Sequence, residues 1–290
     1  MKAKNTKAAE NAEDFFSHDH ITTIGPQDGW HMLNFRELWA YRELLGALTW
    51  RDIKVRYKQT VLGALWAIIQ PFAMMVVFSL IFGKGAKVDS GGVPYAIFYY
   101  SILVPWTFFQ VCVPMSGNSL IANSKLISKV YFPRAIIPSA SALGGIVDFF
   151  IASGVLLAIM AYYKFPIEAS LLLWPLFVIP LAILIIAIGM VFSSLNVKYR
   201  DIKYTIPFFI QVMLFVSGVA VPISQFPEKY HMVLGLNPVA AMLNAFRAAA
   251  LPGVQINWTE YGIACGVSVI LLILAATYFR KTEKAFADLI

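Results

Sequence analysis

The sequence predicts an all-α polytopic membrane protein, and three observations support this fold class. Hydrophobic residues make up 59% of the 290 residues and charged residues 13%, against roughly 45–50% and 25% in soluble domains. Charge-free runs recur along the chain, and the run from Gln59 to Gly83 is long enough to cross a bilayer as a helix. The lysines and arginines cluster between alternate runs, as membrane topology requires.

The charge distribution predicts that both termini face the cytoplasm. Fifteen Lys and Arg residues fall in the segments Phe35–Thr60, Lys125–Arg134, Lys198–Lys203 and Arg280–Lys284, while the intervening loops hold only five. Because Lys and Arg are retained on the inner side of the membrane, the four rich segments are expected there. The net charge of +7 then reflects topology, and we expect no nucleic-acid partner.

Six membrane spans are expected from the apolar runs and the charges that bound them. They are about Leu62–Phe82, and then within Tyr95–Gly117, Ala135–Tyr163, Leu171–Asn196 and Tyr204–Val221, with the last at Tyr261–Phe279. The fifth is short, and Pro207 would fit only in the first turn of its helix. An even number of spans agrees with the predicted placement of both termini.

The chain divides into three predicted regions. Residues 1–34 are polar and aperiodic, and we interpret them as a disordered cytoplasmic tail. Residues 35–60 are interpreted as an amphipathic interfacial helix and a linker, because Leu38, Tyr41, Leu45 and Leu48 recur at helical spacing. The period-two alternation of Arg51–Lys58 is typical of a strand, but an isolated strand beside a membrane would leave its edges unpaired. Residues 61–290 form the six-span transmembrane domain.

Between the fifth and sixth spans, the apolar, proline-divided segment Pro222–Glu260 predicts short re-entrant or periplasmic helices. One is expected over Val239–Leu251, started by Asn237 as the cap and Pro238 at the first helical position.

Three ordered motifs resemble one transporter family. They are WRDIKVRYKQTVLGALWAIIQP (Trp50–Pro71), NSKLISKVYFPRAIIP (Asn123–Pro138) and LNVKYRDIKY (Leu195–Tyr204). Together they resemble the membrane (permease) subunit of type-2 ABC exporters for lipid-linked polysaccharide, the family of O-antigen, capsule and teichoic acid exporters. The resemblance covers the chain from about Phe35 to the C-terminus.

The resemblance implies a channel-forming subunit of an ATP-driven transporter in the bacterial inner membrane. It would export an O-antigen-like glycan, linked to undecaprenyl pyrophosphate, to the periplasmic side. It implies a homodimer, surrounded by membrane lipids, with two copies of a separate cytoplasmic ABC ATPase. The alternatives are a type-2 exporter of a drug or small lipid, a membrane-embedded glycan-lipid enzyme, and a proton-coupled carrier.

Catalytic and metal chemistry are not expected in this chain. No phosphate-binding GxxxxGK[ST] loop occurs, so ATP and Mg²⁺ are expected in the partner ATPase and no cofactor here. His18, His20, His31 and His231 lack metal-ligand spacing. No nucleophile–base set or carboxylate pair stands at a membrane boundary, so we expect a transport subunit and not an enzyme.

The resemblance implies a cytoplasmic contact with the ATPase. Its predicted residues are Arg51, Asp52, Lys125, Lys129, Arg134, Lys198, Arg200, Asp201 and Lys203. Lys125 and Lys129 share one face of a predicted short helix at i, i+4 spacing, which Phe132–Pro133 ends. Leu126, Ile127, Val130 and Tyr131 are expected on its other, apolar face.

Two further sites concern the cargo. The basic residues Arg51, Lys54, Arg56 and Lys58 are expected to attract the pyrophosphate of the lipid carrier, although attraction to anionic lipids is the commoner explanation for such charge. Trp66, Phe208, Phe209 and Phe215 are predicted to line a glycan passage, since aromatic rings offer sugars an apolar face. The alternative for these and other aromatics is a belt at the lipid headgroups.

Asp148 is the one charged residue that the predicted spans contain. Intramembrane acids are functional hypotheses by default. The sequence offers it no partner, so we expect a structural role, with the carboxyl buried against small residues such as Gly144, Gly145 and Ser153.

Overall fold

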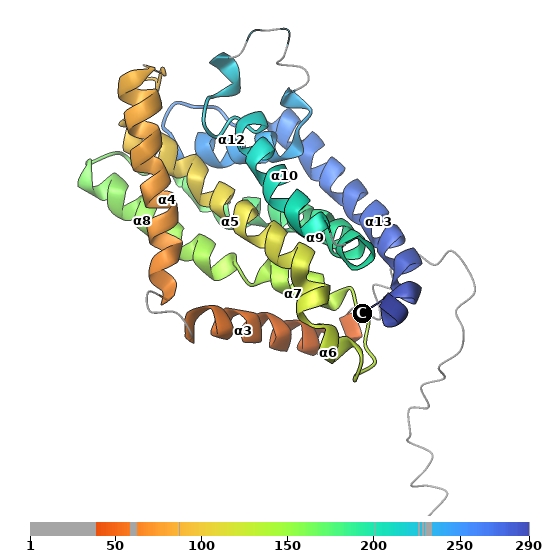
Figure 1. The fold of residues 1–290 in the computed structure, drawn as a ribbon. Helices are drawn as coiled ribbons and strands as arrows, with labels where there is room; N and C mark the ends of the chain where they lie inside the picture. The colour runs from red at the N-terminus through yellow and green to blue at the C-terminus, as the bar shows by residue number, and fades with distance from the viewer. Residues whose placement is uncertain are drawn as a thin grey trace, which may run out of the picture. The chain divides into compact units, whose positions relative to one another are not determined.

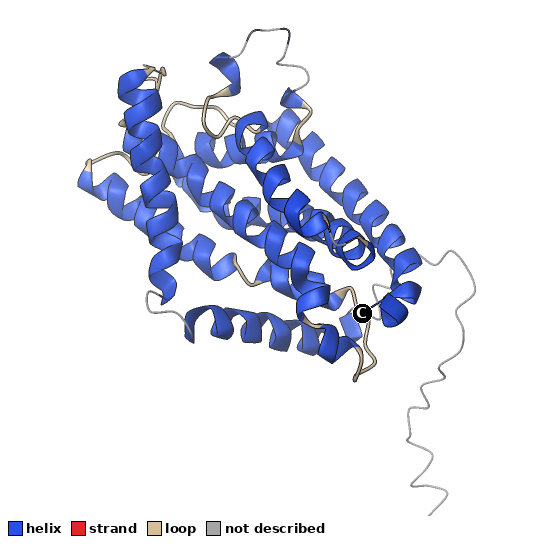
Figure 2. Cartoon of the chain, in the orientation of Figure 1, coloured by secondary structure: helices blue, strands red, loops and turns tan. Residues whose placement is uncertain are grey.

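The computed structural model describes residues 39–58, 63–86, 88–199, 201–225, 227, 229 and 234–289. All regular secondary structure in these ranges is helical, as Figure 2 shows, and they contain no strand. The predicted tail, residues 1–34, and the predicted start of the interfacial helix, residues 35–38, lie outside the described residues. The predicted all-α class is confirmed.

The helices follow one another as in Figure 1. The α-helices are α3 (Arg42–Lys58), α4 (Trp66–Phe78), α5 (Tyr95–Ala122), α6 (Ser124–Ile127), α7 (Ile136–Leu143), α8 (Ile146–Tyr162), α9 (Trp174–Lys198), α10 (Ile202–Val216), α12 (Pro238–Ala250) and α13 (Trp258–Leu289). The 3-10 helices are η1 (Gly63–Leu65), η3 (Ala169–Leu173) and η4 (Ile223–Gln225), and η2 (Ser79–Gly85) is a π-helix.

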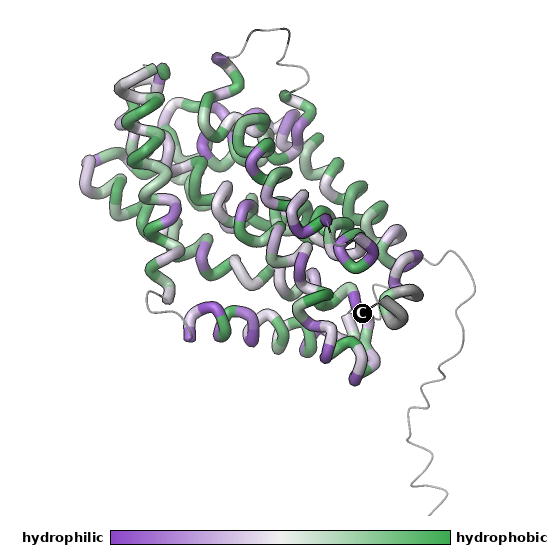
Figure 3. Tube along the Cα trace, in the orientation of Figure 1, coloured by the Kyte–Doolittle hydropathy of each residue, from purple (hydrophilic) through white to green (hydrophobic). Residues whose placement is uncertain are grey.

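Five helical segments in the described part of the chain are long and apolar enough to cross a membrane. They are Gly63–Gly83, Tyr95–Ala122, Ile136–Tyr162, Ala169–Lys198 and Trp258–Glu283. These correspond to the first, second, third, fourth and sixth predicted spans. Figure 3 shows hydrophobic residues along them and hydrophilic residues concentrated on α3.

The fifth predicted span corresponds to α10, which has only 15 residues. At about 1.5 Å per residue it covers about 22 Å, less than the ~30 Å hydrocarbon core. It ends at a turn in which Gly218 has a φ of +71°, and Val219 and Ala220 beyond it are buried. Pro207 lies in its second turn, not in its first as expected, because the helix already begins at Ile202.

The second span, α5, is the centre of the bundle. It packs against α4, α7, α8, α9, α10 and α12, and 78% of its most apolar window is buried, against 17% for the first span. Its aromatic residues Tyr99, Tyr100, Trp106, Phe108 and Phe109 are fully or almost fully buried. The alternative of a headgroup belt is therefore wrong for these five residues, which fill the protein core instead.

Small residues let the third and fourth spans approach α5 closely. A Cβ atom at Gly189 of α9 would collide with the side chain of Ser116, and one at Gly145, between α7 and α8, would collide with the sulfur of Cys112. Without a hydrophobic force between helices in lipid, such close packing is a main source of association.

The predicted helix after the fifth span is confirmed as α12. The Asn237 side chain accepts a hydrogen bond from the Val239 backbone N–H at 3.0 Å, and Pro238 occupies the first helical position. The Trp174 indole N–H donates to the Phe246 carbonyl at 2.9 Å, which fastens α12 to α9.

We predict that Gly189→Leu destabilises the protein, because the added side chain must displace Ser116 and separate α5 from α9. Overpacking of this kind costs ~1–3 kcal/mol. The measurement is the melting temperature of the detergent-purified protein. Gly154→Leu is the matched control, since Gly154 lies in α8 with no neighbour within 4 Å of its Cβ position. Equal melting temperatures for the two variants would contradict the proposed packing constraint.

Candidate functional site

The helix α3 runs across one end of the bundle (Figure 1) and carries four of the predicted basic residues, Arg51, Lys54, Arg56 and Lys58. It continues without a break to Lys58, so the alternating segment Arg51–Lys58 is helical, and the predicted linker over these residues is part of the helix. Leu48 and Ile53 are buried, and α3 packs against α7.

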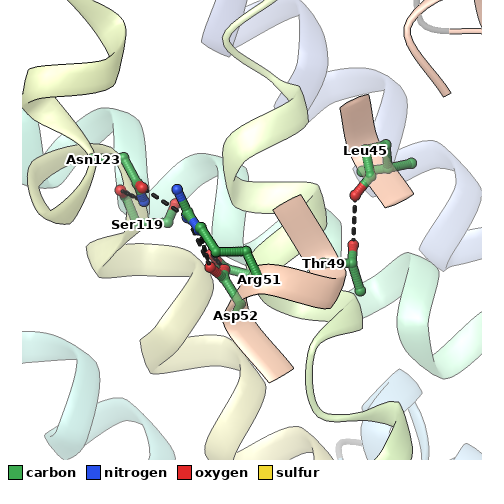
Figure 4. Close-up of polar contacts among 7 residues, drawn as sticks. Leu45, Thr49, Arg51, Asp52, Ser119 and Asn123 are labelled. Carbon is green, nitrogen blue, oxygen red and sulfur yellow. Dashed lines mark hydrogen bonds and ion pairs between the residues drawn. The ribbon is translucent and has the colours of Figure 1, made fainter. Parts of the chain in front are cut away.

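A polar network joins the middle of α3 to two spans (Figure 4). The Arg51 guanidinium forms an ion pair with Asp52 at 2.7 Å and donates to the Asn123 side-chain oxygen at 2.8 Å. The Ser141 hydroxyl donates to the other oxygen of Asp52 at 2.9 Å. Arg51 and Asp52, both predicted to contact the ATPase, therefore attach α3 to α7 and to the end of α5.

A second attachment corrects the expectation for Asp148. Sequence reasoning gave this acid no partner, but its carboxylate forms an ion pair with Arg56 and accepts a hydrogen bond from the Tyr57 hydroxyl. Arg56 also contacts the sulfur of Met115. The partners were missed because they precede Asp148 by about ninety residues and were expected at the membrane surface.

Tyr57 acts as the donor in this cluster. Its burial raises the pKa of the hydroxyl well above the usual range, and so does the hydrogen bond to the Asp148 carboxylate. The phenol therefore stays protonated at neutral pH and donates to Asp148.

Beside the ion pair lies a cavity of about 130 Å³ between α4, α5 and the start of α8. Arg56, Trp66, Gln70, Thr107, Asp148 and Phe149 are among the residues that line it. Arg56 and Trp66, predicted for two different sites, meet at this one cavity. Gln70 and Thr107 were missed by sequence reasoning; a polar residue inside an apolar span was the available signal for both.

The remaining predicted ATPase-contact residues fall into two groups. Arg134 is held by α13, since its guanidinium donates to the Glu283 carbonyl at 2.8 Å and its backbone N–H to the Glu283 carboxylate at 3.2 Å. Lys125 and Lys129 are exposed. The predicted short helix is only the four-residue α6, so Val130 and Tyr131 do not continue its apolar face and are exposed.

The junction of α9 and α10 carries the second group of predicted contact residues. Lys198, Asp201 and Lys203 are exposed, and Arg200 lies outside the described residues. The Asn196 side-chain N–H₂ donates to the Gly117 carbonyl at 3.1 Å and to the Asn118 side-chain oxygen at 2.9 Å. This junction is therefore fixed beside the end of α5.

The structure separates the four predicted passage aromatics. Trp66, Phe208 and Phe215 are exposed over 54%, 66% and 55% of their surface. Phe209 points toward α9, where its ring lies 5.2 Å from that of Phe192, so it does not share a surface with Phe208. Lys54 and Lys58, predicted to attract the lipid carrier, are exposed on α3, and Lys54 lies 5.4 Å from the ring of Trp50.

Comparison with known proteins decides which family this bundle represents. The profile of the family described as "ABC-2 type transporter" matches residues 43–251. The chain belongs to the ABC-2 type transporter family. The predicted transport subunit is thus confirmed, as is the predicted location in the bacterial inner membrane, and an ABC ATPase is its partner class.

Several relatives of this ABC-2 permease are similar over most of their length. The O-antigen export system permease protein RfbA of Klebsiella pneumoniae is 30% identical over 250 residues, covering 86% of this chain and 95% of that one. RfbA of Myxococcus xanthus is 26% identical over 261 residues, 87% and 97% of the two chains. The polysialic acid transport protein KpsM of Escherichia coli is 24% identical over 246 residues, 82% and 93%.

We predict that Arg56→Gln and Asp148→Asn each destabilise this permease, because each breaks the Arg56–Asp148 ion pair. Both side chains are 20% exposed, so the loss is smaller than the ~3–5 kcal/mol of a fully buried pair. The double variant should regain part of the lost melting temperature, since it removes both charges. Lys129→Gln is the control for loss of a solvated charge. Strictly additive losses would contradict the coupling.

Proposed function

We propose that this ABC-2 permease is the transmembrane subunit of an ATP-driven exporter of lipid-linked polysaccharide. The main support is sequence similarity to relatives that are named for O-antigen export and polysialic acid transport. The similarity covers at least 93% of the length of each relative. The glycan, attached to undecaprenyl pyrophosphate, moves from the cytoplasmic to the periplasmic side through a homodimer that binds two copies of the ATPase.

The proposed topology has six spans with both termini in the cytoplasm. The charge asymmetry between alternate loops supports this orientation, because it puts α3, α6 and the end of α13 on the inner side. The fifth span then consists of α10 and the turn after it. Burial of Val219 and Ala220 keeps the backbone of that turn away from lipid.

The proposed ATPase contact consists of the exposed charges at the cytoplasmic end. These charges suit docking to a soluble partner. They are Lys125 and Lys129 at α6, and Lys198, Asp201 and Lys203 at the junction of α9 and α10. The helices beneath this surface are joined by three of the predicted contact residues. Arg51 and Asp52 join α3 to the end of α5 and to α7, and Arg134 bonds to α13.

We predict that Lys125→Glu with Lys129→Glu lowers glycolipid-stimulated ATP hydrolysis by about tenfold or more, because reversing two charges disturbs the electrostatic complementarity of the proposed contact, and a loss of ~1.4 kcal/mol is tenfold. The measurement uses the reconstituted permease–ATPase complex. Lys164→Glu is the matched control, since Lys164 is an exposed lysine in the loop after α8. Unchanged assembly and hydrolysis in the double variant would place the contact elsewhere.

Stimulation by a drug or small lipid, with none by glycolipid, would contradict the proposed cargo.

The proposed glycan passage uses exposed aromatic side chains of the first and fifth spans. The helices α4 and α10 both pack against α5 and leave much of their own surface uncovered, including Trp66, Phe208 and Phe215. In a homodimer these surfaces meet their copies, and exposed rings there offer a repeating polymer many weak contacts. The exposed Lys54 and Lys58 attract the pyrophosphate at the inner leaflet.

We predict that alanine at Trp66, Phe208 and Phe215 together lowers surface glycan several-fold without lowering protein level or basal ATP hydrolysis. The reason is the loss of apolar faces along the passage. Phe150→Ala is the control, because Phe150 is an exposed ring on α8. Normal surface glycan in the triple variant would remove these residues from the passage.

A further inference from the structure

A second cavity, of about 230 Å³, is formed by α12 and the segment that leads into α13. Its polar lining comes from Asn244 and Arg247 of α12, from Gln255 and Asn257 of the loop, and from Glu260 in the first turn of α13. None of these residues belongs to the cavity beside Asp148 or to the exposed aromatic surface. Under the proposed topology, this cavity lies on the periplasmic side.

Arg247 is the unusual member of this lining. Its guanidinium lies 5.0 Å from the ring centroid of Phe98 and donates to the Asn244 side-chain oxygen at 2.7 Å. No carboxylate pairs with it among the described residues. Burial lowers the pKa of Arg247 to about 10, so it remains charged at neutral pH. A largely buried cation without an anionic partner retains hydrogen-bond donors for a ligand.

The helix that carries Arg247 is firmly held. Besides the Trp174 bond to Phe246, the Ser170 hydroxyl donates to the Ala249 carbonyl at 2.9 Å. On the opposite wall, the Asn257 side chain caps α13 by accepting from the Glu260 backbone N–H at 3.2 Å. The helix α12 and the start of α13 are therefore held by hydrogen bonds on both sides of the cavity, which favours binding.

The mixture of groups decides the ligand class. A guanidinium donates only, a carboxylate accepts only, and the three side-chain amides do both, which together match the neighbouring hydroxyls of a sugar ring. A phosphate would be opposed by the Glu260 carboxylate in the same wall. The volume is below the ~300–1,000 Å³ of sites for larger organic ligands, so it suits a single sugar unit.

We propose that this cavity is a binding subsite for one neutral sugar unit of the glycan as it leaves the transporter. The proposal rests on the proposed function, because it takes the cargo to be a polysaccharide. Arg247 donates to ring hydroxyls, Glu260 accepts from them, and the amides complete the contact. Such a site holds the emerging chain weakly between steps of export.

The test measures saturation-transfer NMR from the reconstituted permease–ATPase complex to glucose, galactose, mannose and N-acetylglucosamine. We expect transfer to at least one sugar, and binding about tenfold weaker in Arg247→Gln and in Glu260→Gln, since each loses hydrogen bonds to a charged group. Glu260 is exposed, so its variant should fold even if Arg247→Gln does not. Lys164→Gln and Thr259→Ala are controls, because neither residue lines the cavity.

Three results would overturn the subsite. The first is no transfer to any of the four sugars, and the second is equal transfer in the wild type and both cavity variants. The third is binding of inorganic phosphate that depends on Arg247 without any transfer to the sugars, which would assign the cavity to a phosphate group. The proposed function is read separately, from loss of surface glycan on deletion of the permease. That result stands or falls independently of sugar binding to the purified complex.

Discussion

A charge at membrane depth needs a partner of opposite sign, and the Arg56–Asp148 ion pair meets this need where α3 meets α8. With the bond between Asp52 and Ser141, it gives α3 two attachments to the two halves of the third span. Because α3 also holds Asn123 at the end of α5, it is tied to the central helix of the bundle. Helix α3, which lies within the proposed ATPase contact, is thus joined to the spans by specific polar bonds and not by apolar packing alone.

The bundle itself depends on close approach to α5. In lipid, helices gain little from burying apolar surface, so small residues and shape complementarity must hold them together. Gly189 and Gly145 provide that approach at Ser116 and Cys112, and buried aromatic rings fill the space on the other half of α5. The same arrangement leaves α4 largely uncovered, which supports the proposed homodimer.

The two ends of the bundle carry different chemistry. The α3 end gathers exposed lysines beside a network of paired charges, which suits a soluble partner and anionic lipid phosphates. The α12 end holds a fixed cavity in which one cation, one carboxylate and three amides meet. A carrier for a long polymer needs contacts at several points and no single tight site. The proposed passage and the proposed subsite are both of this kind.

The sequence by itself determined the all-helical membrane class, five of the spans and the capped helix after Asn237, since these follow from local hydrophobicity, charge and capping chemistry. It also carried the three motifs that resemble the ABC-2 family. Only the tertiary structure decided that Asp148 pairs with Arg56, that Phe209 faces α9 while Phe208 is exposed, and that Arg247 and Glu260 line one cavity. Each of these depends on contacts between segments far apart in the chain or on helix rotation, which neither composition nor local periodicity specifies.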